Sequence, residues 1–142
     1  CTVPARVLTK IRWEPGLTSE MRDAAEELQY ARIVKNQILF DERFWPTDNY
    51  SLVSDRTSHF FFHATQRQRG EQGILTSYVI GDKADVLASQ NPSARRDMIT
   101  RDLIPVSAQA PQLARAILSQ AWQRDPWTQG AYALYRPGQW FG

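Results

Sequence analysis

The stretch that most constrains the fold is Ile33–Phe40, where apolar residues alternate with residues of other types. Side chains of a β-strand point alternately to its two faces, so this pattern predicts a strand with one apolar face. One face of such a strand carries Val34, Ile38 and Phe40, and the other carries Ile33, Lys35, Gln37 and Leu39. Lys35 therefore shares a face with apolar neighbours. It is either a lysine at an exposed edge of a sheet or a residue with a chemical role.

Two further segments predict a pair of adjacent antiparallel strands. Residues 59–63, with the sequence His-Phe-Phe-Phe-His, are typical of a buried strand. Residues 74–80 form a second apolar run, and the charged segment 66–73 between the two contains Gly70 and Gly73. A short connection with glycine between two strand-like runs is typical of a β-hairpin.

Three segments carry the signals of a helix start. The capping residues are Thr18 or Ser19 for the first, Asp82 for the second, and Asn91 followed by Pro92 for the third. Short polar side chains cap the first N–H groups of a helix, and proline is tolerated at the first helical position. The first helix has one apolar face, made by Met21, Ala24, Ala25 and Leu28. The second helix is expected to extend through Leu87, and the third towards Leu103.

The remaining segments are less regular. Residues 7–13 alternate in part, residues 49–57 are polar and predict a loop, and residues 125–142 predict a structured loop with a short strand. Periodicity does not decide whether residues 116–122 form a strand or a helix. Together the segments predict an α+β fold, with a mostly antiparallel sheet and helices packed on one face.

Composition argues against several classes of function. The chain has 142 residues, of which 42% are hydrophobic, and this suits one ordinary domain with a real core. Its net charge of +2, with basic residues dispersed among acidic ones, is too small to indicate nucleic-acid binding. No apolar stretch approaches the roughly 20 residues of a membrane span. We therefore expect a soluble protein, cytoplasmic by default, although the compartment stays unknown.

Cysteine and histidine give no sign of a metal or a disulfide. Cys1 is the single cysteine, which excludes an internal disulfide and a cysteine-based zinc site. His59 and His63 stand four residues apart in a predicted strand, with no carboxylate near them to complete a ligand set. We expect no metal site.

Several short motifs follow one another along the chain. They are Cys1-Thr2-Val3-Pro4, Val34-Lys35, Phe44-Trp45, the segment 77–84 (Ser-Tyr-Val-Ile-Gly-Asp-Lys-Ala), the segment from Trp122 to Tyr132, and Pro137-Gly138-Gln139. In this order they resemble the flavin-containing amine oxidase family, and within it the L-amino-acid oxidases more than the monoamine or polyamine oxidases. The resemblance extends over nearly the whole chain and implies part of a substrate-binding domain.

The resemblance gives roles to Lys35 and Trp122. Lys35 matches the family lysine that holds a water against the flavin N5 atom, which makes it the predicted catalytic and cofactor-contacting residue. Trp122 matches the family tryptophan that lies close to the isoalloxazine ring. Both have ordinary alternatives, since a lysine at a sheet edge and a tryptophan in a core need no cofactor.

Three residues match the substrate pocket of the family. Tyr132 matches a position that forms an aromatic wall beside the flavin in amine oxidases. Phe62 and His63 match the stretch in which L-amino-acid oxidases carry a tyrosine that helps to bind the substrate carboxylate. His63 either replaces that hydroxyl as a hydrogen-bond donor or is a histidine with satisfied ring nitrogens at the end of a sheet. The substrate therefore stays open between an amino acid and an amine.

Ala131 matches the cysteine that joins the flavin covalently in monoamine oxidases. Without a thiol that bond cannot form, so the resemblance implies FAD bound non-covalently.

The sequence also lacks parts that such an enzyme needs. It has no G-x-G-x-x-G motif to seat the cofactor pyrophosphate on a helix N-terminus. The chain also opens on Cys1-Thr2-Val3-Pro4, which looks like the end of a strand within a longer fold. We expect residues 1–142 to be a single partial domain that is inactive alone. Its partner would be the FAD-binding remainder of the enzyme, as another subunit or the rest of the polypeptide.

The resemblance therefore implies part of an FAD-dependent oxidoreductase that acts on the CH–NH2 group of L-amino acids or amines. The products would be an imine, then a keto acid or aldehyde with ammonia, and hydrogen peroxide. The alternative is a non-catalytic binding or assembly module that retains the substrate-domain fold. A homodimer stays open in either case.

Overall fold

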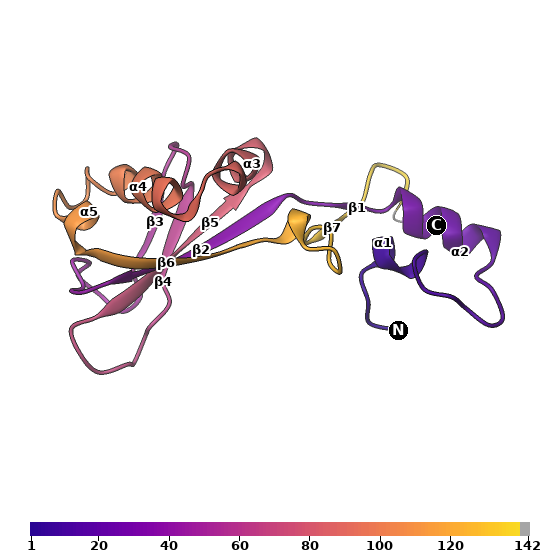
Figure 1. Ribbon diagram of the computed structural model, residues 1–142, viewed down its shortest axis with the longest axis horizontal. Coiled ribbons are helices and arrows are strands. Elements are labelled where there is room, and N and C mark those ends of the chain that lie inside the picture. The colour runs from indigo at the N-terminus through magenta and orange to yellow at the C-terminus, as the bar shows by residue number, and fades with distance from the viewer. Residues whose placement is uncertain (140–142) are drawn as a thin grey trace. The chain divides into compact units, whose positions relative to one another are not determined.

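The computed structural model describes residues 1–139, which form two compact units (Figure 1). The terminal unit consists of Cys1–Ile33 with the segment that starts at Ala121, and the sheet unit consists of Val34–Gln120. Residues 140–142, which belong to the predicted C-terminal loop, lie outside the described residues. That residues 1–142 form one partial domain of a larger fold stays a prediction.

A five-stranded sheet dominates the sheet unit. Its strands are β2 (Ile33–Phe40), β3 (Ser51–Val53), β4 (Phe60–His63), β5 (Gly73–Ile80) and β6 (Ala114–Ala121). They lie in the order β3-β4-β5-β2-β6. β4 pairs antiparallel with both β3 and β5, and Phe60 stands opposite Val53 on one side and Tyr78 on the other. The predicted strand at 33–40 and the predicted hairpin are confirmed.

Three helices lie on one face of this sheet (Figure 1). They are α3 (Gly81–Ser89), α4 (Pro92–Asp102) and α5 (Ala110–Leu113). The expected α+β fold, with an antiparallel sheet and helices on one face, is therefore confirmed for this unit.

The start of α4 is fixed from two sides. The side-chain oxygen of Asn91 accepts a hydrogen bond from the Ala94 N–H at 2.9 Å, as a capping residue should. The Arg95 guanidinium donates to the carbonyls of Leu87 and Gln90, each at 2.8 Å. The last carbonyls of a helix lack partners within it, so Arg95 both completes the end of α3 and ties α4 to it.

The core lies between the sheet and these helices. Its fully buried side chains include Val34, Ile38, Phe40, Phe61, Leu75, Val79, Leu87, Ile99 and Leu103. On β2 the buried positions alternate with partly exposed ones, as the sequence pattern predicts. The face of the sheet opposite the helices carries Lys35 of β2, and we call it the lysine face.

The terminal unit is built around a small two-stranded sheet. Its elements are α1 (Ala5–Leu8), α2 (Ser19–Glu27), β1 (Gln29–Tyr30), the 3-10 helix η1 (Trp122–Arg124) and β7 (Ala133–Leu134). β1 and β7 pair antiparallel, and Tyr30 stands opposite Ala133. The predicted cap of the first helix is confirmed, because the Thr18 hydroxyl accepts a hydrogen bond from the Met21 N–H at 3.2 Å.

Two segments near the ends of the chain differ from the sequence prediction. Residues 1–4 belong to no described strand, and α1 follows at once, because the Pro4 carbonyl accepts a hydrogen bond from Val7 N–H and starts a helical turn. The open choice at 116–122 is resolved as strand β6 up to Ala121, followed by η1 from Trp122.

Three smaller differences arise in the sheet unit. The predicted loop 49–57 contains β3, because residues 51–53 pair with β4, a contact that local sequence does not encode. β4 begins at Phe60, since His59 has a positive φ of 59° and cannot continue an extended strand. The predicted cap Asp82 lies inside α3, which starts at Gly81, and Ile80 takes the capping position two residues earlier.

Candidate functional site

Lys35 is partly buried on the lysine face. Its ammonium nitrogen lies 5.7 Å from the centroid of the Tyr78 ring, on the neighbouring strand β5. On the other side of the strand, Asn36 is fully buried and its side-chain oxygen accepts a hydrogen bond from the Ser119 hydroxyl at 2.7 Å. The backbone of the predicted catalytic residue is thus fixed in the middle of the sheet.

Three aromatic side chains share the lysine face with Lys35, and only Tyr78 stands on a strand adjacent to β2. Tyr78 stands opposite Phe60, and Phe62 stands opposite Thr76, so Phe60, Phe62 and Tyr78 share the lysine face. The rings of Phe60 and Phe62 are 5.7 Å apart between centroids. Phe60 and Tyr78 were not predicted as site residues. The signal that could have found them is the register of the hairpin, which places Tyr78 directly across from Phe60.

His63 points to the other face of the sheet. Neighbouring residues of a strand point to opposite faces, so His63 lies with buried Phe61 on the core side while Phe62 lies on the lysine face. The structure therefore does not bring the two predicted pocket residues Phe62 and His63 to one side of the sheet.

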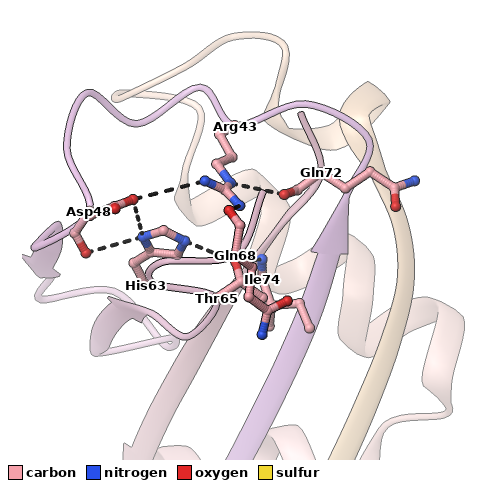
Figure 2. Close-up of polar contacts among 7 residues, drawn as sticks. All are labelled: Arg43, Asp48, His63, Thr65, Gln68, Gln72 and Ile74. Atoms are coloured by element: carbon pink, nitrogen blue, oxygen red, sulfur yellow. Dashed lines mark hydrogen bonds and ion pairs between the residues drawn. The ribbon is translucent and has the colours of Figure 1, made fainter. Parts of the chain in front are cut away.

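Both ring nitrogens of His63 are engaged, as Figure 2 shows. Nδ1 lies 3.1 Å from the Asp48 carbonyl oxygen, and Nε2 lies 2.9 Å from the Thr65 hydroxyl. The Thr65 oxygen also accepts a hydrogen bond from the Ile74 N–H at 3.1 Å. Nδ1 also lies 3.6 Å from a carboxylate oxygen of Asp48, and the tautomer with its hydrogen on Nδ1 donates to the Asp48 carbonyl and accepts from the Thr65 hydroxyl at Nε2. Burial raises the pKa of the nearby Tyr50, whose carbonyl accepts a bond from the His63 N–H.

Arg43 closes the same end of the sheet (Figure 2). Its Nε donates to the Gln72 carbonyl at 2.8 Å and one terminal nitrogen donates to the Gln68 carbonyl at 2.9 Å. The other terminal nitrogen lies 3.9 Å from a carboxylate oxygen of Asp48. These contacts bind the hairpin connection to the segment after β2, and they account for Arg43, Asp48 and His63 as structural residues.

The Trp122 loop of the terminal unit, residues 122–132, closes on its own first residue. The Trp122 carbonyl accepts hydrogen bonds from the Gly130 N–H at 2.9 Å and from the Thr128 hydroxyl at 3.0 Å. The Asp125 carboxylate accepts from the N–H groups of Trp127 and Thr128 at 2.9 and 3.0 Å. The two predicted flavin-contacting residues, Trp122 and Tyr132, stand at the two ends of this closed loop.

The end of the Trp122 loop is fixed to β1. The Ala131 N–H donates to the Ala31 carbonyl, and the Ala31 N–H donates to the Tyr132 carbonyl, each at 3.0 Å. A Cβ at Gly130 would lie 2.7 Å from Tyr30 Cβ, so this position has room only for glycine. Tyr132 itself keeps 63% of its surface exposed. A rigid backbone thus presents an uncovered aromatic ring.

The predicted site residues lie in both units. Lys35, Phe62 and His63 belong to the sheet unit, and Trp122 and Tyr132 belong to the terminal unit. That the two groups flank one cofactor stays a prediction.

A comparison with protein families decides what kind of protein this is. The model of the family described as flavin containing amine oxidoreductase matches residues 1–141. The chain belongs to this family. Family membership implies a flavin cofactor in the full enzyme, and the relatives of the chain are oxidoreductases.

Curated relatives within the family are similar over the whole chain. An L-amino-acid oxidase from Siganus canaliculatus is 24% identical, over 97% of this chain and 28% of the relative. The flavin-dependent L-tryptophan oxidase RebO from Lentzea aerocolonigenes is 25% identical, over 92% of this chain and 29% of the relative. The chain thus spans less than a third of the length of these amine oxidoreductases.

Solved structures agree on the fold. Putrescine oxidase, in a structure described as wild type bound to putrescine, has a TM-score of 0.81 and 19% identity over 96% of this chain and 31% of that chain. Cyclohexylamine oxidase from Brevibacterium oxydans IH-35A has a TM-score of 0.72 and 18% identity over the same shares. Separately, none of the helices within residues 1–139 is long and apolar enough to span a membrane.

Each unit, taken by itself, keeps a group that suits contact with a flavin. Lys35 keeps an ammonium group and Tyr132 an aromatic ring that the units' own cores do not cover.

Proposed function

We propose that this chain is the substrate-domain part of an FAD-dependent oxidase that acts on the CH–NH2 group of amines or L-amino acids. The observation that carries the proposal is the position of Lys35. In a member of a flavin-containing family, a lysine lies in mid-sheet on the face opposite the helices, with the ring of Tyr78 beside it.

When bound, FAD would supply the two-electron chemistry that oxidises the CH–NH2 group and reduces oxygen to hydrogen peroxide. The substrate is left with a C=N bond. Water adds to this imine and releases ammonia and a keto acid or an aldehyde, so a water must be held close to the reacting carbon.

The residues of this chain bind and orient the reactants. Lys35 donates hydrogen bonds to a water at the flavin N5, because an ammonium group has three donors and no acceptor. Trp122 and Tyr132 supply rigid aromatic surfaces for the ring and for the substrate side chain, at little cost in conformational entropy. Phe62 extends the apolar wall of the pocket. Ala131 leaves FAD without a covalent link.

The choice between amine and amino acid depends on a carboxylate partner. Relatives of both kinds are similar to this chain, since their names include L-amino-acid oxidase, putrescine oxidase and cyclohexylamine oxidase. Phe62 has no hydrogen-bond donor. His63, the predicted donor, has both ring nitrogens engaged on the core side. The proposal therefore keeps both substrate classes and takes the FAD-binding remainder of the polypeptide as the required partner.

The test uses the polypeptide that carries residues 1–142 together with its FAD-binding part. We expect a yellow protein that releases its flavin on acid denaturation and loses its colour when an amine or amino acid is added without oxygen. Lys35→Met should slow the return of colour in oxygen by at least about tenfold, because a positioned charge at the reacting group contributes at this scale. Lys10→Met is the matched control, since Lys10 is exposed.

Two results would contradict the proposal. A colourless, stable protein would favour the non-catalytic module. A yellow protein in which Lys35→Met and Lys10→Met behave alike would remove the lysine from the site.

A further inference from the structure

The contact between Lys35 and Tyr78 is the observation from which we start. The two residues lie on adjacent strands and share the lysine face, with Lys35 Nζ 5.7 Å from the centroid of the Tyr78 ring. A cation within about 6 Å of an aromatic centroid is attracted to the negative potential of the ring face. The contact therefore meets the distance criterion of a cation–π interaction.

No carboxylate competes for the ammonium group. Within residues 1–139, no Asp or Glu oxygen lies within ion-pair distance of Lys35 Nζ. A carboxylate would accept hydrogen bonds from the ammonium, but a ring face attracts the charge without taking its donors in this way. A lysine whose ammonium group contacts a ring face can therefore still donate hydrogen bonds from its N–H groups to water.

The backbones beneath the contact leave little freedom. Val34 and Asn36, on either side of Lys35, are fully buried, and Asn36 is bonded to Ser119 on β6. Phe60 stands directly opposite Tyr78 on β4, the strand that pairs with β5 on the side away from β2. What remains free is the long side chain of Lys35, which carries large rotamer entropy unless something holds its end.

We propose that Tyr78 is a positioning residue for Lys35: the aromatic ring holds the ammonium on the lysine face with its hydrogen-bond donors free for a water. The role of Lys35 in holding a water during catalysis rests on the proposed function. The contact itself does not depend on any cofactor.

The first test observes the contact by NMR. The chain has only three lysines, Lys10, Lys35 and Lys83, so selective 13C labelling of lysine Cε gives three resolvable signals. Protons held over an aromatic face move upfield, and we expect this for the Cε protons of Lys35, whose signal is assigned by its loss in Lys35→Arg. Tyr78→Phe should keep the upfield shift, and Tyr78→Leu should abolish it.

Lys83 is the internal control for folding. Its ammonium donates to the carbonyls of Asp55 and Arg56, so its signal reports the native loop and should be the same in every variant. If the Lys35 protons of the unsubstituted protein show no upfield shift while the Lys83 signal is native, the inference is overturned without any variant.

The second test is a double-mutant cycle in the FAD-loaded enzyme. Tyr78→Leu should slow flavin reoxidation by about threefold to tenfold, the range of a cation–π contact, and Tyr78→Phe should leave the rate nearly unchanged. In a Lys35→Met background, Tyr78→Leu should have no further effect. An equal loss in both backgrounds would show that Tyr78 acts independently of the lysine and would overturn the positioning role. A polypeptide that binds no flavin contradicts the proposed function, and the NMR result then decides the contact.

Discussion

At the scale of single residues, burial separates His63 from Phe62. The side chain of His63 is fully buried on the core side of β4, and its ring links the Asp48 carbonyl to the Thr65 hydroxyl. Phe62 points to the lysine face. Two residues that are adjacent in sequence therefore have different environments, and a substitution at each should affect a different property.

We expect His63→Leu to lower the free energy of unfolding by about 2 kcal/mol, because it leaves the buried Thr65 hydroxyl and the Asp48 carbonyl without their partner. Phe62→Leu should cost less, because its ring is only partly buried, and should instead change KM for substrates with large side chains. Urea denaturation measures the first effect and steady-state kinetics the second. Unchanged stability of His63→Leu with a raised KM would instead place His63 in the substrate pocket.

At the scale of residues, the sequence predicts on which face of a strand a side chain lies, because side chains alternate between the two faces. It predicts that Lys35 lies opposite Val34 and Ile38, and the structure confirms this because β2 is regular throughout its length. It could not decide whether His63 is a hydrogen-bond donor to the substrate or a histidine with satisfied ring nitrogens, since this depends on Asp48, fifteen residues away along a polar loop. A cation–π partner on another strand is likewise set by register and not by local pattern.

At the scale of elements, the Trp122 loop depends on one close approach. Gly130 has a φ of +131°, and a Cβ there would lie 2.7 Å from Tyr30 Cβ and 2.9 Å from the Ala31 oxygen. Gly138 also has a positive φ, of +88°, but a Cβ there would meet nothing within 4 Å. A substitution at Gly130 therefore adds both backbone strain and steric overlap, and one at Gly138 adds backbone strain alone.

We expect Gly130→Ala to destabilise the terminal unit by more than about 3 kcal/mol, because strain and overlap add. Gly138→Ala should cost only about 1 kcal/mol, from strain alone. Thermal unfolding of the two variants, followed by tryptophan fluorescence, gives the comparison. Equal costs at both positions would mean that the Trp122 loop does not lie against Tyr30.

The cap of α4 gives a second prediction at this scale. Asn91→Ala removes the acceptor for the Ala94 N–H and should lower the free energy of unfolding by about 1 kcal/mol. Asn91→Asp is the matched control, because it keeps an acceptor at a helix N-terminus and should cost little. Chemical denaturation measures both. A loss as large in Asn91→Asp as in Asn91→Ala would argue against the cap.

Elements with local signals could be predicted, and those that depend on distant pairing could not. The caps at Thr18 and Asn91 mark α2 and α4 in the sequence because a capping residue bonds to an N–H three residues away. β3 has no such signal, since its strand character comes from pairing with β4. β6 was ambiguous for the same reason.

At the scale of the whole molecule, the chain covers only part of the length of its relatives. It matches the flavin-containing amine oxidoreductases from residue 1 to residue 141, yet spans less than a third of the relatives' length. Each unit holds its own site candidates on a fixed backbone, Lys35 on β2 and Tyr132 beside β1. That the two sets of candidates contact one cofactor stays a prediction.

The most direct measurement is a crystal structure of the FAD-loaded polypeptide that contains this chain. The account predicts that Lys35 Nζ lies one water away from the flavin N5 and that the indole of Trp122 contacts the same isoalloxazine ring. A native fold in which either side chain points away from the flavin would contradict it.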